Sequence, residues 1–173
     1  MFTLVTTRYD NKTWQETLNY RIRRRLNCIY GPPCPLSEKI ELGTPVFVIE
    51  MNNSINQIMG IGLINNRTED RTYKIYEDTN FNRYIYIGKY HISREILDEY
   101  NSLLVYILDE ILFKGKTHSK RGAGLTKIPE KVLKLEICER IDIKKEIKKI
   151  FIYHFRDKVK LENNNIENNN TEK

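Results

Sequence analysis

The sequence predicts an α+β fold: a curved β-sheet or small barrel flanked by helices, with a helical C-terminal part. Up to about residue 93, apolar residues mostly alternate with polar ones or form short β-branched runs, and from Ser93 onward they recur every three or four residues. The chain has 173 residues, of which 40% are hydrophobic, so it is long and apolar enough to bury one core.

The first predicted elements are a strand and a helix. Residues 2–7 (FTLVTT) are short, apolar and β-branched, which is typical of a strand. Residues 10–26 predict a helix, because apolar side chains recur every four residues and Asp10 or Asn11 can cap its start. The proline-rich stretch 30–45 is predicted to be non-helical.

The clearest predicted feature is a β-hairpin. Residues 46–51 and 58–64 form two β-branched runs around an Asn-rich turn. Gly60 and Gly62 alternate on the second run, so one face of that strand is bare backbone and a neighbour must lie close against it. Tight packing by a helix is the favoured explanation.

Two further strands are predicted over residues 73–78 and 83–92, which are rich in Tyr and Ile. The period then changes, and residues 94–113 predict the longest helix of the chain. This helix is apolar on one face and acidic on the other, which is typical of a core helix.

The C-terminal part is predicted to be helical and to end in a tail. Pro129 suits the first turn of a helix that runs to about Glu139, and Asp142 can cap a last helix. The Asn-rich residues 159–173 have almost nothing to bury, so they are predicted to be disordered, and the domain is predicted to span residues 1–158.

The positive charge of the chain is concentrated in one loop. From Lys114 to Lys134 seven basic residues stand against one acidic residue, so this stretch alone accounts for the net charge of +6. A second basic cluster, YRIRRRL, includes Arg21, Arg23 and Arg24. Such concentration favours an acidic partner, first nucleic acid and second an anionic surface, although a loop of this kind can also be merely solvated.

The same loop contains fragments of two catalytic motifs, and neither is complete. The GKT at residues 115–117 would end a P-loop, but the glycine that this motif needs falls on Glu110. The HSK at residues 118–120 resembles the start of the phospholipase-D-like pattern H-x-K-x4-D, but the required aspartate falls on Leu125. The three histidines are scattered, with no carboxylate placed by the sequence to orient them. We therefore expect no catalytic residues and no cofactor.

The cysteines and the hydropathy pattern indicate where such a protein works. Cys28, Cys34 and Cys138 are odd in number and lack a usual zinc spacing, and the first residues do not predict a signal peptide. We therefore expect reduced thiols, no metal site and an intracellular, cytoplasmic location. No apolar run of about 18 residues exists, so no membrane span is expected.

Several loop residues suit contact with phosphate groups. Basic side chains can donate hydrogen bonds, and glycines let the main chain approach closely and offer its N–H groups. The predicted nucleic-acid backbone contacts are Lys116, His118, Lys120, Arg121, Gly122 and Gly124, together with Arg21, Arg23 and Arg24.

The order of elements over residues 2–155 resembles the PUA-like superfamily, most closely its YTH and EVE branches. The hairpin at residues 46–66 (VFVIEMNNSINQIMGIGLINN) is similar to the family's hairpin, and residues 83–97 (RYIYIGKYHISREIL) resemble the strand that leads into its closing helix. The basic stretch before the last helix stands where YTH proteins grip the backbone. The richness in Asn, Ile, Lys and Tyr resembles proteins of AT-rich genomes, including large DNA viruses.

The resemblance implies a small barrel flanked by helices that binds modified bases in RNA or DNA. YTH proteins enclose a methylated base with tryptophans, whereas this chain has one tryptophan, and Arg23 or Arg24 stands near the place of the first cage residue. The residues expected to line a base pocket are Trp14, Tyr30, Tyr76 and Phe81, each of which could instead belong to the core.

We therefore expect a non-catalytic nucleic-acid-binding module, with RNA favoured over DNA, that recognises a modified or flipped base. The alternative is a structural or interaction protein of a virion or larger complex, whose basic patch neutralises nucleic acid or meets an acidic protein partner. A viral member would work in the host cytoplasm or the virion. An enzyme that acts on nucleic acid is the third hypothesis, and no catalytic constellation supports it.

Overall fold

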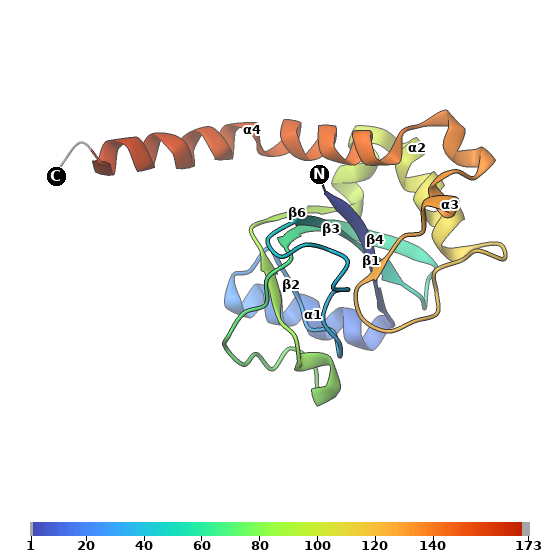
Figure 1. Cartoon of the computed structure of the whole chain (residues 1–173), viewed down its shortest axis with the longest axis horizontal. Coiled ribbons are helices and arrows are strands. Elements are labelled where there is room, and N and C mark those ends of the chain that lie inside the picture. Colours follow the sequence, from blue (N-terminus) through green and yellow to red (C-terminus); the bar gives the residue numbers. More distant parts are fainter. Residues whose placement is uncertain (1, 171–173) are drawn as a thin grey trace.

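The computed structural model describes residues 2–170, with the side chains of residues 2–156, and it has the predicted α+β fold (Figure 1). A curved sheet lies between two long helices on one face and a smaller sheet with one helix on the other. The helices are α1 (Asn11–Arg24), α2 (Arg94–Phe113), α3 (Glu130–Leu133) and α4 (Ile143–Asn170), with 3-10 turns at Thr79–Asn82 and Glu136–Arg140. The strands are β1 (Thr3–Tyr9), β2 (Cys28–Tyr30), β3 (Pro45–Asn52), β4 (Gln57–Asn65), β5 (Tyr86–Gly88), β6 (Tyr90–Ser93) and β7 (Thr126–Lys127).

The main sheet has the strand order β6-β4-β3-β1-β7. β1 and β3 run parallel, with Thr3 opposite Val46, and the other neighbours run antiparallel. A parallel pair needs a long crossover, and here α1, β2 and the proline-rich segment provide it. β2 and β5 form the smaller, two-stranded sheet.

Alternate residues of the central strand β3 face two different cores. Phe47 and Ile49 pack with α2 and α4, whereas Val46 and Val48 face the smaller sheet. Because β3 is covered on both faces, it is apolar at nearly every position instead of alternating. One carboxylate, that of Glu50, is buried among these side chains.

Most of the predicted elements are confirmed. β1 covers the first predicted strand, β3 and β4 pair over the predicted hairpin, and α2 covers the predicted helix. The predicted caps are also present: Asp10 accepts from the Thr13 N–H at 2.7 Å, and Asp142 accepts from the Lys145 N–H at 3.0 Å. α4 is longer than α2, so the expectation that α2 is the longest helix is wrong. Within residues 2–170, no helix combines the length and the hydrophobicity needed to cross a membrane.

Three predicted elements differ from the structure. The single strand predicted over residues 83–92 is divided at Lys89 into β5 and β6, which belong to different sheets. Residues 73–78 are not a strand, because the side-chain oxygen of Asn82 accepts from the N–H groups of Ile75 and Tyr76 and takes the place of a partner strand. The helix predicted after Pro129 is interrupted at Leu135, whose backbone is extended, and only α3 and a 3-10 turn form. The tail predicted to be disordered lies outside the residues whose side chains are described, so its disorder and the domain boundary remain predictions.

The bare face of β4 is covered by side chains instead of by a helix. A Cβ at Gly62 would lie 2.0 Å from the Tyr30 hydroxyl and 3.0 Å from Cys28 Sγ, and one at Gly60 would lie 2.9 Å from His91 Nε2. The expected close neighbour is therefore confirmed, while its expected identity as a helix is wrong. Gly62 allows the smaller sheet to lie directly against the main one, whereas Gly60 makes room for His91 of the neighbouring strand β6.

Candidate functional site

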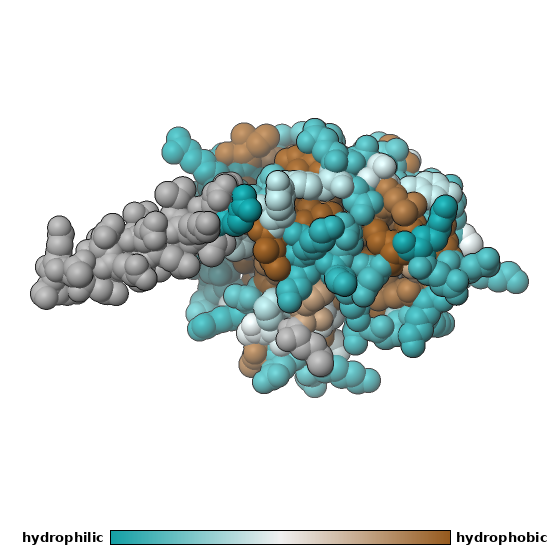
Figure 2. Space-filling view, turned by 90° about the horizontal axis from the view of Figure 1, so that it is seen from above, coloured by the Kyte–Doolittle hydropathy of each residue, from teal (hydrophilic) through white to brown (hydrophobic). Residues whose placement is uncertain are grey.

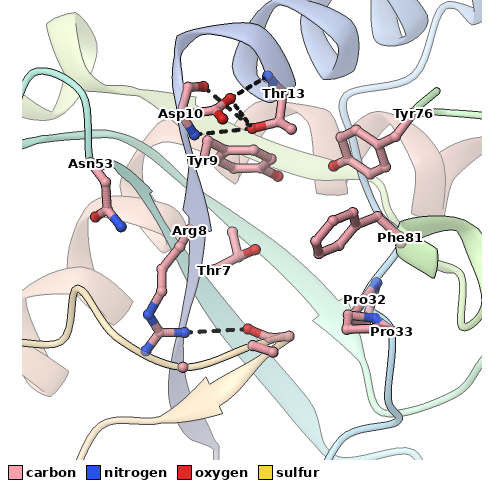
Figure 3. Close-up of a pocket in the computed structure, with 14 residues that line it drawn as sticks. Thr7, Arg8, Tyr9, Asp10, Thr13, Pro32, Pro33, Asn53, Tyr76 and Phe81 are labelled. Atoms are coloured by element: carbon pink, nitrogen blue, oxygen red, sulfur yellow. Dashed lines mark hydrogen bonds between the residues drawn. The ribbon is translucent and has the colours of Figure 1, made fainter. Parts of the chain in front are cut away.

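A pocket of about 330 Å³ opens where β1 ends and α1 begins (Figure 3). Further walls come from the loop after β2, the turn after β3, the segment 76–81 and the glycine segment 122–124 of the basic loop. We call this cavity the aromatic pocket. Its segments are far apart in the sequence, so only the folded chain brings them together.

Aromatic rings form one side of the pocket. The rings of Tyr76 and Phe81 meet edge to face with centroids 6.1 Å apart, and Tyr9 stands beside them (Figure 3). Tyr9 and Tyr76 are buried, whereas Phe81 is 38% exposed, so Phe81 is the ring that a bound molecule could reach. Asn82 fixes this segment by donating to the Tyr76 carbonyl at 2.8 Å.

Arg8, from β1, holds the basic loop against the pocket. Its guanidinium donates to the carbonyl of Ser119, to Thr126 Oγ1 at 3.1 Å, to Thr6 Oγ1 at 3.1 Å and more weakly to the carbonyl of Gly124 at 3.4 Å. Burial lowers the pKa of Arg8, but a guanidinium starts from so high a value that it stays charged. Since most of its N–H donors bind the protein itself, Arg8 shapes the wall of the pocket and has few donors left for a bound molecule.

The basic loop carries its charge beside the aromatic pocket. Gly122 and Gly124 line the pocket with φ angles of 115° and 72°, a left-handed conformation that favours glycine. The carbonyl of Lys120 accepts from the Asn53 side chain at 3.0 Å, which ties the charged part of the loop to the turn after β3. The predicted phosphate donors keep access to solvent: Lys116 and Arg121 are exposed, and His118 and Lys120 are half-buried.

Two predicted site residues serve the interior instead. Arg21 is 5% exposed, and its Nη2 donates to Glu50 at 2.6 Å. Tyr30 is 1% exposed, and its hydroxyl donates to the same carboxylate at 2.8 Å. The assignment of Arg21 to phosphate contact and of Tyr30 to base stacking is corrected accordingly, because both side chains are almost wholly buried and bind Glu50.

Three more predicted residues lie apart from the aromatic pocket. Trp14 is half-buried and packs edge-on against Tyr9 at a centroid distance of 5.2 Å, so it supports the pocket wall without lining it. Arg23 and Arg24 are exposed at the C-terminal end of α1, about 20 Å along the helix from its start. Four predicted residues therefore line one pocket: Tyr76, Phe81, Gly122 and Gly124.

The structure also contains a buried charge cluster that the sequence analysis did not find. Glu50 accepts from Arg21 and Tyr30 through one oxygen, and its other oxygen lies 2.9 Å from His91 Nε2. Burial alone would raise the pKa of Glu50, but Arg21 and His91 hold it well below its usual range. The sequence did contain an indication of this cluster: Glu50 stands inside an apolar strand, and a buried carboxylate needs hydrogen-bonding or charged partners.

In this cluster His91 has a carboxylate partner, Glu50, which the sequence alone did not indicate. The cluster contains a base and its orienting group, yet Tyr30 is its only hydroxyl, and burial raises the pKa of that phenol well above its ordinary value. Within the described part of the chain, no group of three or more His, Cys, Asp or Glu side chains is placed to hold a metal ion. The cluster therefore fits a structural role.

Polar residues at the junction of β1 and α1 complete the aromatic pocket. Thr7, Asp10 and Asn53 line it, and the sequence pattern does not indicate the role of Thr7 or Asn53. Hydrogen bonds from Thr13 lower the pKa of Asp10, so its carboxylate is ionised at neutral pH. The predicted cap at Asp10 was the one feature of the sequence that indicated this part of the pocket, because a cap marks the point where the strand ends and the helix begins.

Comparisons with known proteins give one structural likeness. No protein-family model matches the chain, and no curated protein matches it in sequence. The fold is similar to that in the crystal structure of the Pho92 YTH domain in complex with m6A, with a TM-score of 0.38 and 17% sequence identity over 75% of this chain and 80% of that chain. Because the sequence identity and the TM-score are this low, the site has to be judged from the residues of this chain.

Proposed function

We propose that the chain is a non-catalytic nucleic-acid-binding module that takes one unstacked base into the aromatic pocket. The observation that carries the proposal is the shared wall: the glycine segment 122–124 of the most basic loop lines the same pocket as Tyr76 and Phe81. A base and its own phosphate are a few bonds apart, so a reader of bases needs ring faces and cations side by side.

The size and lining of the aromatic pocket support this proposal. A volume of about 330 Å³ lies at the lower end of the range for small-molecule sites, which suits one planar ring system. Phe81 offers a partly exposed ring for stacking, which is worth about 1–3 kcal/mol per base. RNA is favoured over DNA because its unpaired loops present bases that are already unstacked.

The loop would bind phosphates in two ways. Lys116, Lys120 and Arg121 would provide positive charge, while Gly122 and Gly124, which have no side chain, would let a phosphate approach the main-chain N–H groups at the pocket wall. Arg8 takes part only indirectly, because its guanidinium already holds the loop.

Binding of labelled oligonucleotides tests the proposal. Anisotropy titrations should compare single-stranded RNA and DNA, plain and with methylated bases, including N6-methyladenine. Phe81→Ala should weaken binding of the preferred strand by about fivefold to a hundredfold, the loss expected for one stacked base. Tyr84→Ala is the matched control, since Tyr84 has a similar exposed fraction, 37%, and does not line the pocket.

Two results would contradict the proposal. Equal affinity for every strand type would indicate charge neutralisation alone, which is the behaviour of the interaction-protein alternative. Equal effects of Phe81→Ala and Tyr84→Ala would show that the pocket does not hold a base.

A further inference from the structure

A second concave surface lies between α4 and the main sheet, and it shares no residue with the aromatic pocket. It is a groove of about 560 Å³. Its floor is a series of aromatic rings: Phe47 contacts Phe2 and Phe151 with centroid distances of 5.0 and 4.9 Å, and Tyr90 contacts Phe155 at 4.8 Å. These contacts make the floor continuous and apolar.

Basic side chains border this groove. Lys148 and Arg156 lie at its edge, and Lys145 and Lys149 follow on the adjoining surface of α4. From Ile143 to Arg156 the helix carries five basic residues and one acidic residue, Glu146. The surface therefore has a clear excess of positive charge.

Apolar side chains are also exposed beside the groove. Ile152 and Tyr153 are 60% and 61% exposed on the same helix. Seen from above, hydrophobic side chains lie open between hydrophilic ones on this face of the molecule (Figure 2). An apolar patch with a polar rim is typical of a protein interaction site.

We infer that this groove binds an acidic amphipathic helix of a partner protein. Apolar side chains spaced at i, i+3 or i+4 and i+7 would fill the groove, and the flanking carboxylates would meet Lys148 and Arg156. Nucleic acid fits this surface less well. Apart from those two cations and Tyr90 the lining consists of Phe, Pro, Leu and Ile, so the polar edge of a base would lose its hydrogen bonds there.

A designed peptide tests the inference. The probe is a fluorescein-labelled helix of about four turns, with a leucine stripe at that spacing and glutamates elsewhere. Ile152→Glu should weaken its binding about tenfold or more, because one apolar contact is replaced by a like charge. Lys148→Glu should weaken binding of this peptide and strengthen binding of the same peptide with lysines in place of glutamates.

Matched controls separate the groove from general charge and from the aromatic pocket. Ile22→Glu changes another isoleucine exposed on a helix, with 76% exposure, and Lys39→Glu changes another exposed lysine, so both should leave peptide binding unchanged. RNA binding should be unaffected by Ile152→Glu, so the inference can fail or hold independently of the proposed function.

Four outcomes would overturn the inference. One is the absence of binding by the acidic peptide, and another is equal binding by Ile152→Glu. Loss of RNA affinity in Ile152→Glu would assign the groove to nucleic acid. Self-association in analytical ultracentrifugation that Ile152→Glu abolishes would assign it to a second copy of this chain.

Discussion

The hydroxyl of Tyr30 occupies the space that a side chain at position 62 would need. A Cβ on Gly62 would come within 2.0 Å of that oxygen, which is itself held by a 2.8 Å hydrogen bond to Glu50. The smaller sheet approaches β4 this closely because position 62 has no side chain. The glycine therefore allows both the packing of the two sheets and the buried charge cluster.

Gly62→Ala should lower the free energy of unfolding by about 1–3 kcal/mol or more, the usual cost of overpacking a rigid core. Urea unfolding monitored by circular dichroism measures the loss. In the background of Tyr30→Phe the same substitution should cost less, because the hydroxyl that it meets is gone. Equal costs in the two backgrounds would show that the clash lies elsewhere.

Removing the Glu50 charge should destabilise the protein and flatten its response to acid. Glu50→Gln should cost about 3–5 kcal/mol at neutral pH, because Arg21 remains buried without its counter-charge.

The folded-state pKa of Glu50 lies below its unfolded value of about 4.3, so its contribution is complete above that pH and is lost as the pH falls. The urea midpoint of the unsubstituted protein should therefore fall more steeply from about pH 5 to about pH 2 than that of Glu50→Gln. Glu77→Gln is the control: Lys12 lowers the pKa of that carboxyl too, but both side chains are exposed and solvent screens the pair, so its removal should change the profile far less. Parallel profiles of Glu50→Gln and the unsubstituted protein would contradict this prediction.

The basic loop should account for much of the salt dependence of nucleic-acid binding. Lys120→Ala combined with Arg121→Ala should reduce the slope of log affinity against log salt by about 1.4 for a single strand or about 1.8 for a duplex, since each phosphate contact contributes about 0.7 or 0.9 respectively. Titrations at several salt concentrations measure it. The pair Arg23→Ala and Arg24→Ala, at the far end of α1, should leave the slope unchanged. A larger change of the slope in the Arg23 and Arg24 variant than in the Lys120 and Arg121 variant would show that the nucleic-acid backbone runs along α1.

Arg8 should act by positioning the basic loop. Arg8→Lys keeps the charge but cannot reproduce the set of bonds to Ser119, Gly124 and Thr126. Trypsin should then cleave after Lys120 and Arg121 faster than in the unsubstituted protein, and oligonucleotide affinity should fall with little change in the salt slope. Arg8→Gln removes the charge as well, so a slope that falls by about one full contact in Arg8→Gln but not in Arg8→Lys would mean that Arg8 touches phosphate directly.

The sequence was sufficient to predict the elements that are determined by interactions between residues close together in the chain. The hairpin of β3 and β4, helix α2 and the caps at Asp10 and Asp142 follow from side-chain period and hydrogen bonds within a few residues. The strand predicted at residues 73–78 failed because a single side chain, that of Asn82, replaces the partner strand. These hydrogen bonds depend on the path of the loop between residues 76 and 82, which cannot be predicted from the spacing of apolar residues.

The candidate site divides in the same way. The sequence alone determined that charge and glycine gather in one loop and that Tyr76 and Phe81 stand in another, because composition is visible without a fold. Only the tertiary structure decided that these two segments share a pocket, and that Arg21 faces a buried carboxylate while Arg23 and Arg24 face solvent. Two arginines two residues apart point to different sides of a helix, and which side becomes interior depends on a partner, Glu50, that is distant in the sequence.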